Sequence, residues 1–291
     1  MDMIEFLTEP FQYGFMVRAF VGVSLIAVLS GVIGTFIMLK GLAFIGDAIA
    51  HAAFGGLVAA LLLGIPLHVG ALAFGLGTAG LLTVLGRKTR LRADTSLAIL
   101  FTGAFALGVL GLSVRPNFAG DLSALLVGSV LAIGTTDIYW ILGAAALTAL
   151  IMAAAYRHLV FVSFDPVGAE SAGLPVAALQ LLLLSLVALT VVVALQAVGA
   201  ILVVALLITP AATASLYSRR MERLIGLAVL LGLTATWIGL YTSYYLSTPP
   251  GATVVTVATL QFALGLLLRR RRPKTAATAE MEGPGVRRSV A

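Results

Sequence analysis

The stretch from residue 171 to residue 218 contains no charged side chain over 48 consecutive positions. As a single helix it would be about 72 Å long, because each residue advances an α-helix by 1.5 Å. That is more than twice the thickness of a bilayer's hydrocarbon core, roughly 30 Å. The stretch must therefore fold back on itself, and we predict the reversal at residues 196–199, Gln-Ala-Val-Gly. The same reasoning splits the apolar run 224–268 at residues 247–251, Ser-Thr-Pro-Pro-Gly.

The composition excludes a soluble globular protein. Hydrophobic residues make up 60% of the chain and charged residues only 10%, whereas soluble domains carry roughly 25% charged residues. Long uncharged runs are typical of membrane-spanning helices and not of the alternating strands of a membrane barrel. The chain has no cysteine, which excludes both a disulfide framework and a thiolate metal site.

The predicted fold is all-α, a polytopic transmembrane helical bundle of about nine spanning helices, with eight as the alternative. The two divided runs supply four spans, and the other five are predicted at 19–39, 41–63, 67–85, 95–114 and 138–156. Asp121 and Asp137 enclose fifteen uncharged residues, too few for a span, which we interpret as a re-entrant or interfacial piece. We expect residues 1–14 to form an outer N-terminal segment, 15–268 the transmembrane domain, and 269–291 a basic, disordered tail.

The basic residues predict the orientation of the chain. With nine spans and the N-terminus outside, Arg18 and Arg115 are the only two of the 18 Lys and Arg that face outward. The basic loop 86–94 and the C-terminal tail then lie in the cytoplasm, as the positive-inside rule requires. The net charge of +6 therefore reflects membrane topology and does not indicate a nucleic-acid partner. The expected localisation is the cell membrane, with several passes and a cytoplasmic C-terminus.

Asp47 and His51 stand inside the second apolar run, where ionisable groups are costly and usually line a polar path. Four residues apart on a helix, they share one face. If Lys40 marks the water boundary, His51 lies about 16 Å deep. A carboxylate with an imidazole suits a divalent transition metal, and a twofold dimer would present the pair twice. Alternatively, Asp47 pairs with a Lys or Arg, and His51 only bonds a backbone carbonyl.

The sequence resembles the membrane permease subunit of the ABC-type zinc, manganese and iron uptake transporters. GDAIAHAAFGG at 46–56 is similar to the family's G-D-A-x-x-H-A motif, and further similar pieces lie at 90–108, 123–133 and 196–214. The resemblance covers about residues 15–268. It implies a type II ABC importer-like fold in which Asp47 and His51 lie on the metal path.

The segment 163–175 reads as a short cytoplasmic helix, with Asp165 before Pro166 at its start and Gly173 at its end. Small residues such as Ala169 would leave one face smooth. The resemblance implies a coupling helix that docks on an ATP-binding subunit, while the plain alternative is an ordinary loop. Pro210, in the motif ITPAA, would kink its span and could serve gating or packing.

Several other features are interpreted without a ligand role. Residues 75–80 match G-x-G-x-x-G but lie inside a span, so we read them as helix-packing glycines. His68 and His158 are expected at the two membrane surfaces. Asp121 and Asp137 could meet an external binding protein. The chain contains neither a phosphate loop nor an H-E-x-x-H motif, so it is not expected to be an enzyme or to hydrolyse ATP itself.

The leading functional hypothesis is the permease subunit of an ATP-driven importer for zinc, manganese or iron. It would work as a homodimer with cytoplasmic ATP-binding subunits and an extracytoplasmic metal-binding protein, and without a permanently bound cofactor. An ABC permease for a metal chelate or vitamin is one alternative, and a proton-coupled secondary metal transporter is another. The sequence does not separate the three metals, because one carboxylate and one imidazole accommodate all of them.

Overall fold

The computed structural model describes residues 5, 8–89, 91–113 and 128–270. Over these ranges the regular structure is entirely helical, which confirms the all-α prediction. In chain order the helices are η1 (Glu9–Gln12), α2 (Gly14–Leu39), α3 (Ile45–Leu63), α4 (Leu67–Lys88), α5 (Ala93–Ser113), η2 (Val130–Ala132), α7 (Thr135–Phe164), α8 (Pro166–Ser171), α9 (Val176–Val198), α10 (Ala200–Ser215), α11 (Met221–Leu246) and α12 (Pro250–Arg270).

Eight of the described helices are long and apolar enough to cross a membrane. The ninth predicted span corresponds to α10, an apolar helix of only 16 residues. At 1.5 Å per residue it is about 24 Å long, which is shorter than the hydrocarbon core. All nine predicted helical segments are therefore present, and α10 is the one that separates a count of eight from a count of nine.

Both predicted reversals are confirmed. A single residue, Gly199, ends α9 and begins α10, and its φ of 85° lies in the left-handed region that favours glycine. The second reversal runs from Ser247 to Pro249, between α11 and α12. The predicted piece 121–137 lies outside the described residues up to 127, and its remainder contains η2 and the start of α7.

Several helix boundaries differ from the prediction by a few residues, and two of them bear on the candidate sites. The span expected to end at residue 156 continues through Arg157 and His158 to Phe164, because a polar side chain on a helix surface does not break the helix. The helix stops at Asp165, directly before Pro166, where the preceding residue is biased away from helical geometry. The span expected to begin at Gly41 begins instead at Ile45.

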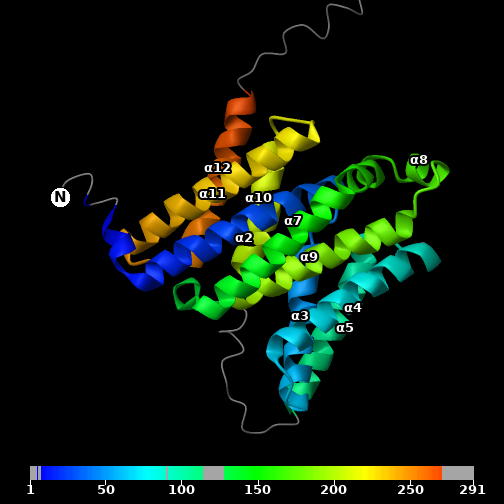
Figure 1. The fold of residues 1–291 in the computed structure, drawn as a ribbon, viewed down its shortest axis with the longest axis horizontal. Coiled ribbons are helices and arrows are strands. Elements are labelled where there is room, and N and C mark those ends of the chain that lie inside the picture. The colour runs from blue at the N-terminus through cyan, green and yellow to red at the C-terminus, as the bar shows by residue number, and fades with distance from the viewer. Residues whose placement is uncertain (1–4, 6–7, 90, 114–127, 271–291) are drawn as a thin grey trace, which may run out of the picture.

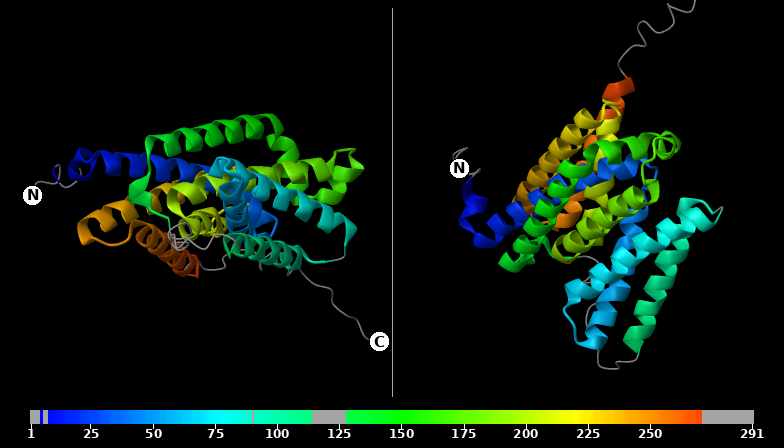
Figure 2. Two further views of the ribbon diagram at one scale, coloured as in Figure 1. Left: turned by 90° about the horizontal axis from the view of Figure 1, so that it is seen from below. Right: turned by 45° about the vertical axis from the view of Figure 1, so that its right-hand side comes forward.

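The helices form two groups in Figures 1 and 2. One, which we call the central bundle, consists of α2, α7, α9, α10, α11 and α12. The other, the three-helix group, consists of α3, α4 and α5, and it lies beside the central bundle. The two groups meet chiefly where α4 and α3 pack against α9. The short helix α8 lies at one end of the molecule, between α7 and α9 (Figure 1).

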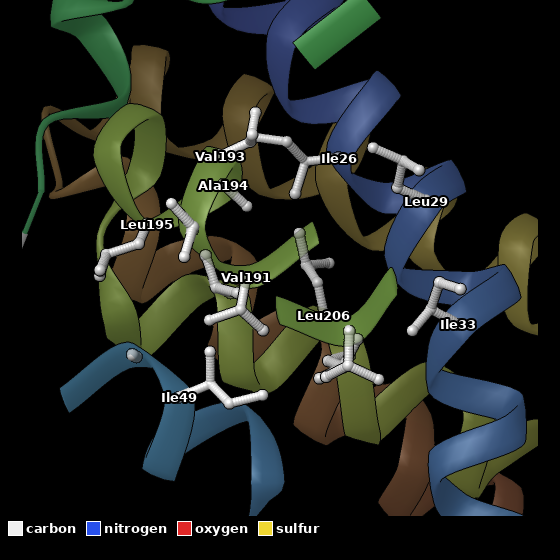
Figure 3. Close-up of a cluster of buried hydrophobic side chains, with 14 of the residues drawn as sticks. Ile26, Leu29, Ile33, Ile49, Val191, Val193, Ala194, Leu195 and Leu206 are labelled. Carbon is white, nitrogen blue, oxygen red and sulfur yellow. The ribbon is translucent and has the colours of Figure 1, made fainter. Parts of the chain in front are cut away.

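Branched aliphatic side chains from four helices fill the centre of the molecule. Figure 3 shows Ile26 and Ile33 of α2 near Val191 of α9, Leu206 of α10 and Ile49 of α3. Each of these five side chains is at most 1% exposed. Ile49 belongs to the three-helix group, so this core ties that group to the central bundle.

An aromatic cluster fastens the N-terminal segment to the central bundle. Tyr244 and Tyr245 of α11 donate hydrogen bonds to the two carboxylate oxygens of Glu9, at 3.3 and 3.1 Å. Phe11 packs against Phe20 of α2 with ring centroids 4.9 Å apart. The predicted outer segment 1–14 is thus packed onto the bundle from Glu9 onward.

Candidate functional site

The turn between α2 and α3 sets the position of the candidate metal ligands. Gly41 takes a φ of 67°, and the amide of Leu42 donates to the carbonyl of Ile37, so the chain leaves α2 and re-enters helix at Ile45. Lys40, which closes α2, is partly buried in this turn, and burial lowers its pKa. Asp47 therefore lies in the first turn of α3, where the helix dipole favours a carboxylate.

This turn interrupts the helix that the predicted depth of about 16 Å from Lys40 assumes. Residues 41–44 do not continue the helix, and from Ile45 to His51 α3 advances about 9 Å. The depth of the pair in a bilayer stays a prediction. The site occupies the first two turns of α3.

Asp47 and His51 share one helix face, as predicted. The His51 Nδ1 atom lies 3.0 Å from the Asp47 carbonyl oxygen and 3.4 Å from the Asp47 Oδ1 atom. A Nδ1 proton given to that carbonyl leaves Nε2 as the imidazole's lone-pair nitrogen, the arrangement common in metal-binding histidines. The bond to a backbone carbonyl is the one that the alternative interpretation foresaw. Among the described residues, however, Asp47 makes no ion pair with Lys or Arg.

The pair remains accessible within one copy of the chain. The side chain of Asp47 is 45% exposed and that of His51 is 23% exposed. Phe101 and Phe105 of α5 approach the imidazole ring at centroid distances of 4.8 and 5.6 Å. These aromatic contacts hold the ring against α5 and leave the carboxylate open.

Asp94 is a second carboxylate at this place, which the sequence interpretation missed. Asp47 and Asp94 line one cavity of about 240 Å³ between α3 and α5, together with Phe44, Leu97 and Phe101. The sequence pattern assigns Asp94 to the basic loop 86–94, but this residue lies in the first turn of α5. An acidic residue directly before a long apolar run was the signal that could have identified it. His51 does not line the cavity but contacts Phe101, which does.

One copy of the chain offers an incomplete ligand set. Over the described residues, no group of three or more His, Cys, Asp or Glu side chains is placed to hold one metal ion. A tetrahedral site needs about four ligands. The geometry thus provides the pair Asp47 and His51, with Asp94 nearby, and requires further ligands from water or another subunit.

The predicted short helix in 163–175 is present as α8. The Asp165 Oδ1 atom accepts a hydrogen bond from the Gly168 amide at 2.8 Å, which caps the helix start. Gly173 has a φ of 80°, and it follows the helix end as predicted. Ala169 is fully buried, so it does not belong to the accessible surface of α8. That surface carries Val167, which is 73% exposed.

The remaining predicted residues occupy separate places. Pro210 is buried inside α10, which continues as a helix on both sides of it. The glycines 75–80 lie within α4, which confirms that they form no nucleotide-binding turn. His158 is exposed on α7. Asp121 lies outside the described residues, whereas His68 and Asp137 line a second cavity at the end of α7 far from α8.

Comparison with known proteins identifies the family. The profile of the ABC 3 transport family matches residues 12–269. The chain belongs to the ABC 3 transport family. The resemblance noted in the sequence is thereby confirmed, and so is the assignment as a multi-pass transporter membrane subunit that is not itself an enzyme.

Relatives of this ABC 3 protein cover nearly its full length. It is 38% identical over 283 residues to the manganese transport system membrane protein MntC of Halalkalibacterium halodurans, covering 94% of this chain and 97% of that protein. It is 40% identical over 262 residues to MntC of Listeria innocua, covering 90% and 93% of the two chains. The solved PsaBC complex of Streptococcus pneumoniae with a Fab contains a chain of similar fold, with a TM-score of 0.80, 33% identity and coverage of 91% and 95%.

Proposed function

We propose that this chain is the membrane permease subunit of an ATP-driven importer for divalent transition-metal ions, with manganese as the principal cargo. The Asp47 and His51 pair carries the proposal, because it places a carboxylate and an imidazole on one accessible face of α3. These ligand types accept manganese, zinc and ferrous iron alike. The manganese transport proteins among its relatives favour manganese over the other two.

A homodimer completes the proposed site. Two copies related by a twofold axis would bring two carboxylates and two imidazoles together, which matches the roughly four protein ligands of a closed site. The exposure of Asp47 within one copy supports this arrangement, since a second copy could reach it. The ligands replace part of the ion's water shell for a short time and release the ion when the path opens to the cytoplasm.

Energy for this cycle comes from partner subunits. Two cytoplasmic ATP-binding subunits would dock on α8, and an extracytoplasmic metal-binding protein would deliver the ion at the opposite end. The capped, exposed helix α8 at one end of the molecule supports such a docking role. The distribution of Lys and Arg supports a cytoplasmic position for α8 and the C-terminus.

Uptake of radiolabelled Mn²⁺ tests the metal site. In cells that lack their own manganese importers, with the ATP-binding and metal-binding partners co-expressed, His51→Ala and Asp47→Asn should abolish uptake while assembly with the ATP-binding subunit is kept. His158→Ala is the matched control, because His158 is exposed on α7 and lies far from Asp47 along the chain. Normal uptake by His51→Ala would contradict the site.

The same assay separates the alternatives. A proton-coupled secondary transporter would import Mn²⁺ without an ATP-binding subunit, so uptake that persists in its absence contradicts the proposal. A permease for a chelate or vitamin would import the complexed metal and ignore the free ion. Competition by unlabelled Zn²⁺ and Fe²⁺ ranks the three metals.

Disrupting α8 tests the coupling role. Asp165→Ala removes the cap of α8, which typically costs about 1 kcal/mol of helix stability. We expect lower uptake with unchanged Mn²⁺ binding by the purified protein. Unchanged uptake at normal expression would argue against docking on α8.

A further inference from the structure

A second cavity lies at the end of the molecule opposite α8. Its volume is about 340 Å³, and its polar lining comes from His68, Ser129, Asp137 and Gln196. These residues belong to α4, the segment before η2, α7 and α9, so four separate parts of the chain bring polar groups to one space. Asp137 is about 40 Å along α7 from the end that meets α8. The metal pair in α3 does not line this cavity.

His68 of α4 and Asp137 of α7 line the cavity from two helices that both pack on α9. The His68 ring packs on the Trp140 ring, with centroids 5.0 Å apart and planes inclined by 31°. Trp140 follows Asp137 by three residues, so the two lie on the same face of α7. The imidazole that packs on Trp140 therefore lies on the face of α7 that carries the Asp137 carboxylate.

A hydrogen bond at the start of α7 and a ring contact between α4 and α7 orient these two side chains. The Asp137 Oδ2 atom accepts a hydrogen bond from the Gly134 amide at 2.9 Å, which fixes the carboxylate and leaves Oδ1 as a further acceptor. The Trp140 ring fixes the plane of the imidazole. An oriented carboxylate and an oriented imidazole are the donor types that divalent transition metals bind.

Gln196 is a further polar side chain at this cavity, and its amide nitrogen makes no hydrogen bond to the described residues. Its Nε2 atom is buried and has no partner among the described residues. Buried amide groups are normally paired, so this side chain is a candidate to rearrange around a bound species. Its carbonyl oxygen is a ligand type that hard cations accept.

One helix, α3, contributes lining residues to both cavities. Asp47 lines the first cavity, and Leu57, further along α3, lines the second. Leu57 follows His51 by six residues, which corresponds to about 9 Å along the helix. An ion that passed from the second cavity to His51 would have this length of α3 to cover.

We propose that this cavity is a receiving site, in which His68 and Asp137 bind a divalent transition-metal ion before it reaches Asp47 and His51. The inference rests on the proposed function, because it places a second site on the same route. With two protein ligands and the amide of Gln196, the ion keeps part of its water shell and can leave readily. Apolar neighbours such as Leu57 and Leu195 lower the local dielectric and strengthen the attraction of the carboxylate.

Mn²⁺ binding to the complete complex tests the receiving site. The full-length permease with its ATP-binding subunit is placed in nanodiscs, and bound Mn²⁺ is counted by electron paramagnetic resonance. Asp47→Asn with His51→Ala should remove one class of sites and leave another. Adding His68→Gln and Asp137→Asn should then remove the remaining Mn²⁺.

The variants are chosen to keep the fold. Asn at position 137 still offers an oxygen to the Gly134 amide, and Gln at position 68 still offers polar atoms to the cavity. His158→Gln is the matched control, since it removes an imidazole that lines neither cavity. Thermal unfolding midpoints within a few degrees of the parent establish that the proteins are folded.

Uptake provides a second measurement. Asp137→Asn alone should raise the Mn²⁺ concentration for half-maximal uptake about tenfold and change the maximal rate much less, because capture is weakened and the inner site is intact. A tenfold loss of the maximal uptake rate, with an unchanged Mn²⁺ concentration for half-maximal uptake, would overturn the receiving role.

The outcomes separate this inference from the proposed function. If the Asp47→Asn, His51→Ala protein binds no Mn²⁺, the receiving site is wrong while the proposed function stands. If that protein binds and imports Mn²⁺ like the parent, the proposed pair is wrong, and loss of binding on changing His68 and Asp137 would still support the receiving site. If His68→Gln and Asp137→Asn lower uptake without lowering Mn²⁺ binding, the cavity serves docking and the inference fails.

Discussion

The contact between α2 and α10 and the contact between α3 and α5 are both built on glycine, yet only the second carries ionisable groups. At Gly34 of α2 a Cβ atom would collide with the carbonyl oxygen of Leu207 in α10. At Gly55 of α3 a Cβ atom would collide with the carbonyl oxygen of Ala104 in α5. Small residues allow helix backbones to approach this closely in both places.

The two contacts differ in what surrounds them. Nine of the 16 residues of α10 are buried, and α2, α11 and α12 pack around it. In α5, only Ser96, Leu97 and Gly108 of 21 residues are buried, and among the described helices it packs chiefly on α3 and α4. A helix packed on one side leaves its other side for lipid, a second copy or a path. Asp47 and Asp94 lie along this less covered contact, where a cation could reach them.

The largest effect is expected at the α2–α10 contact. Gly34→Ala should destabilise the protein by about 3 kcal/mol, because the new Cβ meets the backbone of α10, and α10 is itself packed against α11 and α12. Expression and the thermal midpoint of the purified protein measure this. Gly77→Ala is the control, since a Cβ there meets nothing within 4 Å. A normal midpoint for Gly34→Ala would show that the contact is looser than described.

The matching change in the other contact should cost less stability and more activity. Gly55→Ala is expected to destabilise by about 1 kcal/mol, since α5 can move outward. That movement would carry Phe101 and Phe105 away from His51, so Mn²⁺ uptake should fall more than the loss of folded protein explains. The measurement is Mn²⁺ uptake divided by the amount of membrane-inserted protein. If Gly55→Ala is as unstable as Gly34→Ala, the contrast between the contacts is wrong.

The smallest change in stability is expected at Asp94. Asp94→Asn keeps the shape of the side chain and removes its charge from the cavity that Asp47 lines. The Mn²⁺ concentration for half-maximal uptake should rise about tenfold, equivalent to about 1.4 kcal/mol of lost attraction, with an unchanged thermal midpoint. An unchanged uptake curve would show that Asp94 does not attract the ion and only stabilises the first turn of α5.

Hydropathy predicted most of the fold because the constraint is simple. A run without charge must be helical in a bilayer and cannot exceed its thickness by twofold, which placed the reversals at Gly199 and at Ser247–Pro249. The start of α3 was missed because the turn depends on the backbone of Gly41, and both Gly41 and Leu42 are as acceptable in a span as in a turn.

The candidate site was only half predictable from the sequence. Spacing on one helix puts Asp47 and His51 together, and the structure shows them in contact. Spacing says nothing about which other helix lies opposite, so Asp94 and Phe101 were not connected with the pair. His68 is predicted at a membrane surface, and spacing alone does not connect it with Trp140, which comes from a distant part of the chain.

Gly199 has a practical consequence for anyone who wishes to attach a reporter to this protein. Because one residue both closes α9 and opens α10, there is no spare chain in which an epitope or fluorescent label could be accommodated. The turn at residues 64–66 is exposed throughout and follows a complete helix, so inserted tags belong there.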